Sequence, residues 1–334
     1  MIDTLRFEPA SASEPTRVAI RTMLATVPPD PDPAALAARI RAAIPFGVEL
    51  VGTTPLAVAS RLAGPNPIPR IGAYTPGEVE RLTASWRELP WRILPEEPLA
   101  AVQNVAVDEV LADRVAAGDR PPTLRFWGWA ERAVVLGRCQ SVANEVDPAA
   151  GATVVRRMTG GGAMFVEPHG AITYSLYLPE AAVAGLTIRQ SYEVCDAWVV
   201  RGLRSLGVDA HHVPVNDIAC AAGKIGGAAQ ARRRGAVLHH ATLAFDMDPA
   251  DMARVLRVGR AKVRDRGVAS AAKVVSPLTR QTRLPREAVV AALTQTFRES
   301  FGGSVDRLAP EEWHAAEELA AAKYGTAAWT GDFE

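Results

Sequence analysis

The sequence predicts an α+β fold in which helices cover a mixed, largely antiparallel sheet, preceded by a small α/β module. Residues 171–178 alternate apolar and polar side chains, which is typical of a half-buried strand. Apolar residues between 188 and 206 recur at helical spacing, and Gly207 is placed to cap that helix. The remaining predicted strands fall in clusters instead of alternating strictly with helices: 123–127, 133–137, 154–157, 213–220, 224–231 and 236–245. Further helices are expected from Leu99 onward and at 249–258, 286–300 and 310–323.

The length indicates more than one domain. At 334 residues and 35.6 kDa the chain exceeds the usual size of a single core. Fifteen of the 25 prolines precede residue 99, and the composition changes near Pro90. We therefore expect residues 1–90 to form an N-terminal accessory module of unknown role, and residues 91–334 to form a second, larger domain. Within the module, strands are expected at 17–20 and 48–51 and helices at 34–43 and from Thr75; residues 86–98 are interpreted as the linker.

Composition excludes several classes of function. The 37 basic and 37 acidic residues cancel, so no overall field favours nucleic acid or an anionic membrane. No apolar stretch approaches the roughly 18 residues of a membrane span, and the N-terminus lacks an export signal, so a cytoplasmic location is expected. The three cysteines have no metal-site spacing.

The first candidate site is a glycine segment that follows two arginines. Consecutive glycines let backbone N–H groups approach a phosphate or carboxylate, and adjacent arginines add a charge clamp. A flexible turn is the alternative interpretation. The spacing matches neither a dinucleotide-binding fingerprint nor a P-loop. The candidate residues are Arg156, Arg157, Thr159, Gly160, Gly161, Gly162 and Ala163.

The second candidate site surrounds Lys224, one of only four lysines in the chain. It lies between glycines, ahead of a small-residue strand, where it can reach a phosphoryl or carboxyl oxygen. Asp217, next to Asn216, is expected either to orient this lysine or to bind Mg²⁺. The alternative is that Lys224 is a solvated surface charge.

Histidine and cysteine give weaker signals. His239 and His240 are neighbours in a predicted strand, so alternation sends them to opposite faces and a shared metal is not expected. A structural role is favoured for both. Cys220 lies near Lys224, but the sequence arranges no histidine with it, and a buried apolar thiol is the favoured interpretation.

In order along the chain, these motifs resemble the lipoate-protein ligase family of the biotin/lipoyl ligase fold, which is similar to class II aminoacyl-tRNA synthetases. The resemblance covers about Leu99 to Tyr324 and is closest at residues 156–163. Two departures are Val166, where the family usually has His, and Cys139, where it has Asn. The other matching segments are 104–109, 137–140, 216–218, 223–228, 239–243, Lys262 and 270–278.

The resemblance implies an ATP-dependent lipoate-protein ligase with residues 91–334 as its catalytic domain and with ATP, Mg²⁺ and lipoate in its site. Lipoate or octanoate is activated as an acyl-adenylate and then transferred to a lysine of a lipoyl carrier domain, such as a dehydrogenase E2 subunit or the glycine cleavage H protein. Lys224 is the implied catalytic residue, and Asp217 the implied magnesium ligand. Substrate or cofactor binding is assigned to Arg138, Arg156, Arg157, Thr159, Gly160, Gly161, Gly162, Ala163, Asn216, Asp217, Gly226, His240 and Thr242.

Two alternatives stay open. An ATP-independent octanoyl or lipoyl transferase of the same superfamily passes the acyl group through a cysteine thioester. Such relatives place that cysteine about a dozen residues before the lysine, where this chain reads Ala210-His211-His212-Val213. A non-catalytic lipoate-binding protein is the second alternative. A biotin ligase is disfavoured because the Gly-Arg-Gly-Arg segment is absent.

Overall fold

The computed structural model describes residues 5–24, 33–45, 48–51, 58, 74–257 and 274–331. The chain divides into two compact units, residues 1–82 with 211–215, and residues 83–210 with 216–334. Within the described residues, no helix is both long and apolar enough to cross a membrane.

The smaller unit pairs two short strands and packs helices beside them. Strand β1 (Arg6–Glu8) pairs antiparallel with β2 (Glu49–Val51). The predicted strand at 17–20 is wrong, because this segment is helical. Thr16 and Ile20, four residues apart, are buried on one helix face. The other elements are η2 (Ala10–Ala12), α1 (Ser13–Leu24), α2 (Pro33–Ala43) and α4 (Pro76–Leu82).

The segment interpreted as a linker belongs to the core of the larger unit. Trp86 and Trp91 are buried, and the Trp86 indole donates to the carbonyl of Ala182. Both rings pack against Phe301, and Trp91 also meets the edge of Phe297. Residues 84–88 form η3, and Arg92–Leu99 form strand β3. Burying two indoles favours this packing over a solvated linker.

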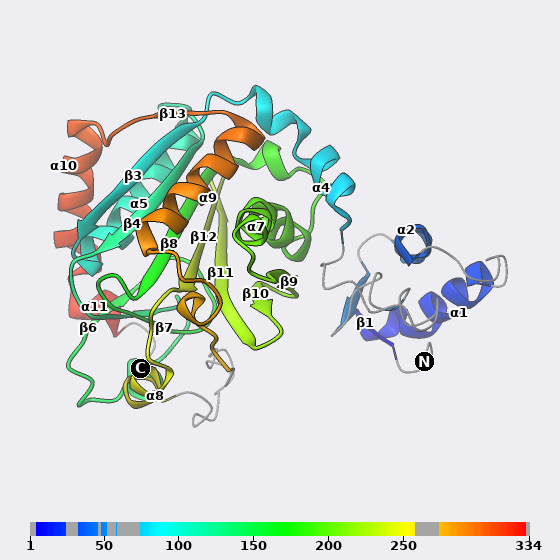
Figure 1. Ribbon diagram of the computed structural model, residues 1–334, viewed down its shortest axis with the longest axis horizontal. Helices are drawn as coiled ribbons and strands as arrows, with labels where there is room; N and C mark the ends of the chain where they lie inside the picture. The colour runs from blue at the N-terminus through cyan, green and yellow to red at the C-terminus, as the bar shows by residue number, and fades with distance from the viewer. Residues whose placement is uncertain are drawn as a thin grey trace. The chain divides into compact units, whose positions relative to one another are not determined.

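A mixed, largely antiparallel sheet forms the centre of the larger unit (Figure 1). β13, β3 and β4 are parallel neighbours, whereas the pairs from β4 through β8, β12 and β11 to β10 are antiparallel. The predicted α+β class is therefore confirmed. The further bounds are β4 (Thr123–Trp129), β8 (Ala171–Pro179), β10 (Asp217–Cys220), β11 (Gly223–Arg233), β12 (Ala236–Ala244) and β13 (Ser304–Val305); β9 (His211–Val213) precedes β10 in the chain.

A second sheet of three strands carries the glycine segment. β5 (Ala133–Leu136) lies in its centre, parallel to β6 (Thr153–Arg156) and antiparallel to β7 (Met164–Val166). The glycines connect β6 to β7, so both ends of the segment are anchored in strands. Short helices α6 (Val142–Glu145) and η4 (Glu180–Val183) lie in connections.

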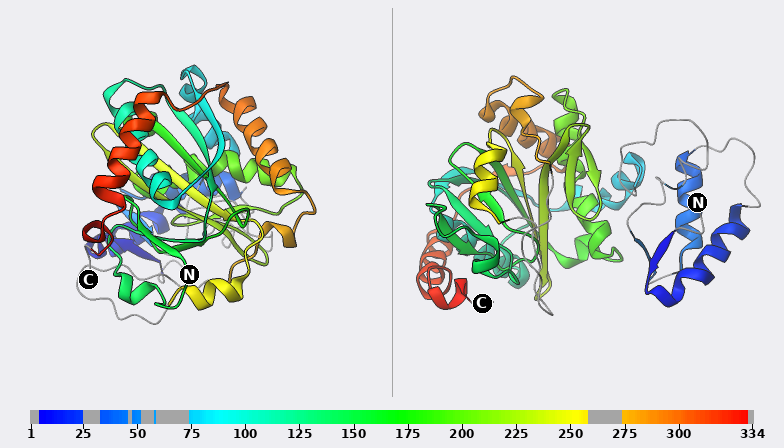
Figure 2. Two further views of the ribbon diagram at one scale, coloured as in Figure 1. Left: turned by 90° about the vertical axis from the view of Figure 1, so that its left-hand side faces the viewer. Right: turned by 90° about the horizontal axis from the view of Figure 1, so that it is seen from below.

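Helices cover both faces of the main sheet (Figure 2). α5 (Ala101–Ala117) packs with α10 (Pro310–Leu319), and α7 (Ile188–Ser205) packs with α9 (Arg286–Phe301). The remaining helices are α8 (Pro249–Val255), η5 (Leu278–Arg280), the π-helical turn η6 (Ala320–Tyr324) and α11 (Ala327–Thr330).

A buried carboxylate joins each helix layer to the sheet. Asp196 of α7 accepts hydrogen bonds from Tyr174, at 2.5 Å, and His239, at 2.6 Å. Tyr174 and His239 therefore point toward α7. Their neighbours along the strands point the other way and meet a second carboxylate.

Asp108 of α5 is that second carboxylate. It accepts from Ser175, Tyr177 and the Nδ1 atom of His240, the last at 2.7 Å. The two adjacent histidines thus lie on opposite faces, as the alternation predicted. Each fixes one helix against the sheet.

The protonation state of His240 links this packing to pH. Burial holds the pKa of His240 below its usual value, and the charge of Arg157 lowers it further, while Asp108 opposes the shift. A neutral ring that donates from Nδ1 to Asp108 can accept at Nε2 from the hydroxyl of Thr159, 2.7 Å away. The folded protein therefore favours the neutral imidazole.

We expect stability to fall as the pH drops below 6.5, because His240 is then protonated in the unfolded chain but resists protonation in the folded one. The contribution approaches about 1.4 kcal/mol per pH unit while the folded-state ring stays neutral. His240→Gln should flatten the decline in urea midpoint between about pH 7 and about pH 5.5. The control is His314→Gln, since His314 is an exposed histidine of α10. An equal decline in wild type and His240→Gln would contradict this assignment.

Candidate functional site

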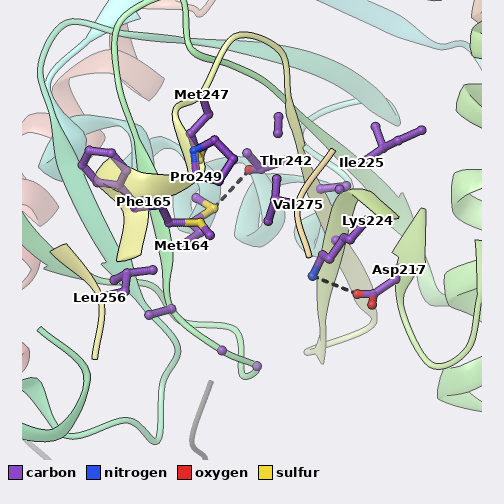
Figure 3. A pocket seen from close by; sticks show the side chains of 18 of the residues that line it. Met164, Phe165, Asp217, Lys224, Ile225, Thr242, Met247, Pro249, Leu256 and Val275 are labelled. Carbon is purple, nitrogen blue, oxygen red and sulfur yellow. Dashed lines mark hydrogen bonds and ion pairs between the residues drawn. The ribbon is translucent and has the colours of Figure 1, made fainter. Parts of the chain in front are cut away.

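A cavity of about 940 Å³ opens between the glycine segment, the main sheet and helix α8 (Figure 3). One side is formed by residues 161–165, and another by strands β11 and β12. Val274 and Val275 line it as well, and Val275 forms a parallel β-bridge with Lys224. Segments distant in the sequence thus converge on one cavity.

Lys224 defines the polar end of the cavity. Its Nζ atom lies 2.9 Å from Oδ1 of Asp217, and the side chains are 30% and 6% exposed, respectively. The carbonyl of Lys224 accepts a hydrogen bond from the amide of Ser276, and its amide donates to the carbonyl of Val274. These two bonds fix the backbone position from which the side chain extends. The ammonium is therefore held at the cavity in a defined place.

Gly227 leaves the space that this ammonium occupies. A Cβ atom at Gly227 would lie 2.6 Å from Nζ of Lys224 and 3.4 Å from Oδ1 of Asp217. Any side chain here would displace the ammonium. This close approach explains a glycine in the middle of a strand.

The other end of the cavity is apolar, as Figure 3 shows. The hydroxyl of Thr242 donates to the Met164 sulfur at 3.1 Å, so this polar group is satisfied within the wall. Such a wall suits a hydrocarbon chain whose polar head reaches Lys224. Its apolar residues come from several elements: Met164, Phe165, Met247, Met252, Leu256 and Val275.

Arg157 supports the glycine segment from within. Its guanidinium donates to the carbonyls of Gly160, at 2.5 Å, and Gly162, at 2.8 Å, and to the hydroxyl of Thr159. Burial lowers the pKa of Arg157 to about 10. Although Arg157 lines the cavity, its donors bind protein groups, in the glycine segment and, through Nη1, at the carbonyl of Val135 in β5.

Arg156 does not line the cavity, which corrects its expected role in a ligand clamp. The side chain is fully buried and donates to carbonyls of Gly137, Gln140, Trp329 and Thr330. Consecutive residues at a strand end point to opposite sides, so the two arginines separate. Arg156 consequently binds protein backbone.

The structure brings most of the predicted site residues together. Arg138, Thr159 and Gly160 are not among the lining residues, and Thr159 is buried beneath the loop against His240. Asn216 lines the cavity while its amide donates to the carbonyl of Ala228 at 2.5 Å. The lining residues that the sequence identified are Arg157, Gly161, Gly162, Ala163, Asn216, Asp217, Lys224, Gly226, His240 and Thr242.

Sequence reasoning missed the apolar wall, because single apolar residues in several elements carry no motif. The expected magnesium ligand, Asp217, is paired with Lys224. The described part of the chain contains no cluster of three or more histidine, cysteine or acidic residues able to hold a metal. Asp217 is therefore the partner of Lys224 in this structure, and its role as a magnesium ligand stays a prediction. Lys262 and residues 270–273 lie outside the described residues.

None of the three cysteines lines the described cavity. Cys220 is buried, and its Sγ atom lies 3.5 Å from the carbonyl oxygen of Gly223. Burial raises the pKa of the Cys195 thiol well above its usual value. Cys139 is half-buried in the connection that follows β5. No thiol is thus placed beside Lys224 at the cavity.

Comparison with known proteins identifies the relatives of this chain. Residues 100–298 match the family model for the lipoyl protein ligase A/B catalytic domain. The octanoyltransferase LipM of Kyrpidia tusciae is 32% identical over 271 residues, covering 72% of this chain and 97% of the relative. LipM of Symbiobacterium thermophilum is 30% identical over 272 residues, covering 72% and 98%.

Solved structures share the fold. A bipartite lipoate protein ligase from Thermoplasma acidophilum, studied with its E2 lipoyl domain, aligns with a TM-score of 0.63 and 29% identity, covering 74% of this chain and 98% of that one. A lipoate-protein ligase A bound with ATP aligns at 0.62 and 29% identity, covering 74% and 100%. A putative ligase from T. acidophilum with bound lipoic acid aligns at 0.61 and 29%, covering 72% and 99%.

The comparisons correct the expected activity. Curated relatives of 24–32% identity, most of them covering 72% of this chain, are named octanoyltransferases, which contradicts the prediction of an ATP-dependent ligase and favours the transferase alternative. The family assignment itself is confirmed. The family model and the relatives together show that this chain belongs to the lipoyl protein ligase A/B catalytic-domain family.

Proposed function

We propose that the protein is an octanoyltransferase that moves an octanoyl group from a thioester donor to a lysine of a lipoyl carrier domain without ATP. The observation that carries the proposal is the Lys224 ammonium, held by Asp217 at the polar end of an apolar cavity. The names of the relatives support the choice of octanoyl transfer.

The cavity suits an acyl chain lying with its carbonyl toward Lys224. Burying the hydrocarbon against Met164, Phe165 and Leu256 removes apolar surface from water, at about 0.8 kcal/mol per methylene. The ammonium then lies where the carbonyl oxygen gains negative charge during the reaction. Gly161 and Gly162 form part of the same cavity wall.

The proposed reaction is aminolysis of a thioester. The neutral amine of the carrier lysine attacks the carbonyl carbon, the C–N bond forms and the C–S bond breaks. The sulfur leaves as a thiol and takes up the proton that the amine loses. Lys224 stabilises the negative oxygen of the tetrahedral intermediate, a contribution commonly worth a factor of about 100 or more. No enzyme thiol enters this route, in accord with the positions of the cysteines.

A lipoyl carrier domain is the proposed acceptor. The archaeal structure was solved for a bipartite ligase system that includes an E2 lipoyl domain, which supports this class of partner. A dehydrogenase E2 subunit and the glycine cleavage H protein remain the predicted acceptors. Lipoate is a further predicted acyl group, supported by the T. acidophilum protein with bound lipoic acid.

Intact-mass spectrometry of the carrier domain tests the proposal. We expect the domain to gain one octanoyl group when the full chain is incubated with octanoyl acyl carrier protein in the absence of ATP. A parallel reaction receives free octanoate with Mg²⁺ and ATP. Acylation only in the parallel reaction would overturn the proposal, and binding without acylation in both would indicate a non-catalytic protein.

Cysteine replacement tests the route of transfer. Because neither thiol lines the cavity, Cys139→Ser/Cys220→Ser should keep its rate within about threefold of wild type, and no octanoylated form of the enzyme should accumulate. Loss of transfer at an unchanged melting temperature would instead require a thioester intermediate on the enzyme.

Lys224→Arg should lower kcat for octanoyl transfer by about 100-fold, because a planar guanidinium cannot take the place of a compact ammonium beside Gly227. Single-turnover acylation of the carrier domain measures the effect. Arg234→Lys is the matched exchange, at an exposed turn residue paired with Asp113. A Lys224→Arg rate close to that of wild type would remove Lys224 from the chemistry.

Gly227→Ala should cost much more activity than stability. The new methyl group meets the end of the flexible Lys224 side chain, which can move aside, so the fold persists while the ammonium is displaced. We expect a roughly tenfold or greater loss of kcat, since small misplacements near reacting atoms are costly. Gly170→Ala is the control, because its Cβ atom makes only ordinary contacts with Glu167. Kinetics and thermal unfolding of both variants decide the outcome.

A further inference from the structure

The C-terminal segment is joined to the back of the glycine segment through Arg156. The Nε atom of Arg156 donates to the carbonyls of Trp329 and Thr330, each at 3.0 Å. The same guanidinium donates from Nη1 to the carbonyls of Gly137, at 3.0 Å, and Gln140, at 2.6 Å. One buried cation therefore ties α11 to residues 137–140, which we call the backing loop.

The Trp329 ring completes the connection. The guanidinium carbon of Arg138 lies 4.3 Å from the ring centroid, and the ammonium of Lys323 lies 4.1 Å from it. The indole N–H donates to the carbonyl of Arg156 at 2.8 Å. Lys323 in turn forms a 2.5 Å ion pair with Glu109 of α5. Trp329 thus links two cations and a strand end, and it is itself only half-buried.

The backing loop contacts the cavity wall directly. The amide of Arg138 donates to the carbonyl of Thr159 at 2.8 Å. Gly137 approaches the glycine segment so closely that a Cβ atom there would lie 2.0 Å from the carbonyl oxygen of Gly161. Gly161 itself lines the cavity. A shift of the backing loop consequently shifts Gly161 and the part of the cavity wall that it forms.

We propose that Trp329 is a positioning residue for the acyl donor: through Arg138 and Arg156 it fixes the backing loop and hence the conformation of Gly160, Gly161 and Gly162. It does not touch the cavity, so it acts through these neighbours. The kinetic part of the test rests on the proposed octanoyltransferase function. The hydrogen–deuterium exchange part of the test does not depend on that function.

Trp329→Ala should raise the KM for octanoyl acyl carrier protein roughly tenfold and leave kcat within about twofold of wild type. The wall that binds the donor is loosened, while Lys224 and Asp217 keep their ion pair, so binding is lost more than chemistry. Trp329→Phe should return KM most of the way to the wild-type value, since a benzene ring can still contact both cations while only the hydrogen bond of the indole N–H to Arg156 is lost.

Hydrogen–deuterium exchange provides a readout independent of activity. In Trp329→Ala, the amides of residues 137–140 and 160–162 should exchange faster, while those of α9 should be unchanged. If Trp329→Ala does not fold, Trp329→Leu keeps apolar bulk and removes the ring, and it receives the same measurements.

Unchanged exchange in the backing loop and glycine segment, together with an unchanged KM, would overturn the assignment. A lower melting temperature at constant KM would also overturn it, because that pattern describes a purely structural residue. If the wild-type protein transfers no octanoyl group, the proposed function fails. The exchange rates in Trp329→Ala then test by themselves whether Trp329 fixes the backing loop and the glycine segment.

Discussion

The ion pair between Lys224 and Asp217 is the interaction on which the cavity depends. The ammonium lies beside an apolar wall, and the largely buried carboxylate of Asp217 compensates its charge there. The pair uses one of the three N–H donors of the ammonium, which leaves others to meet a carbonyl oxygen. Gly227 is required by the same geometry, since it leaves the space in which the ammonium lies. The chemistry therefore follows from one cation, its carboxylate and the absence of one side chain.

Periodicity predicted the sheet well because every second residue of a buried strand must face the same helix layer. The adjacent His239 and His240 show this, since each meets a carboxylate on its own face. Local composition gave a wrong prediction for a segment whose structure depends on contacts with residues far away in the sequence. Residues 86–98 are rich in proline and resemble a linker, yet the indoles of Trp86 and Trp91 find partners near the end of α9. No local pattern contains that information.

The site was predictable to the extent that motifs encode backbone geometry. Lys224 among its glycines could be recognised, because glycine in a strand signals close approach. The apolar wall could not, since Met164 and Leu256 belong to separate elements that only folding brings together. The motifs also could not distinguish a ligase from a transferase. The glycine segment and the lysine suit any reaction that builds negative charge on an acyl oxygen, and they do not specify whether the leaving group is a phosphate or a thiol.

The two arginines before the glycine segment show why adjacent cations need not bind an anion. A run of glycines has no side chains with which to hold its own conformation, and ordering it carries a high entropic cost. Arg157 braces the segment from within through carbonyls of Gly160 and Gly162, whereas Arg156 holds the backing loop from outside. A guanidinium suits this task because its five donors can engage several carbonyls at once, which the three of an ammonium cannot match. The glycines and the arginines are therefore one structural unit, with the arginines giving the flexible backbone a fixed shape.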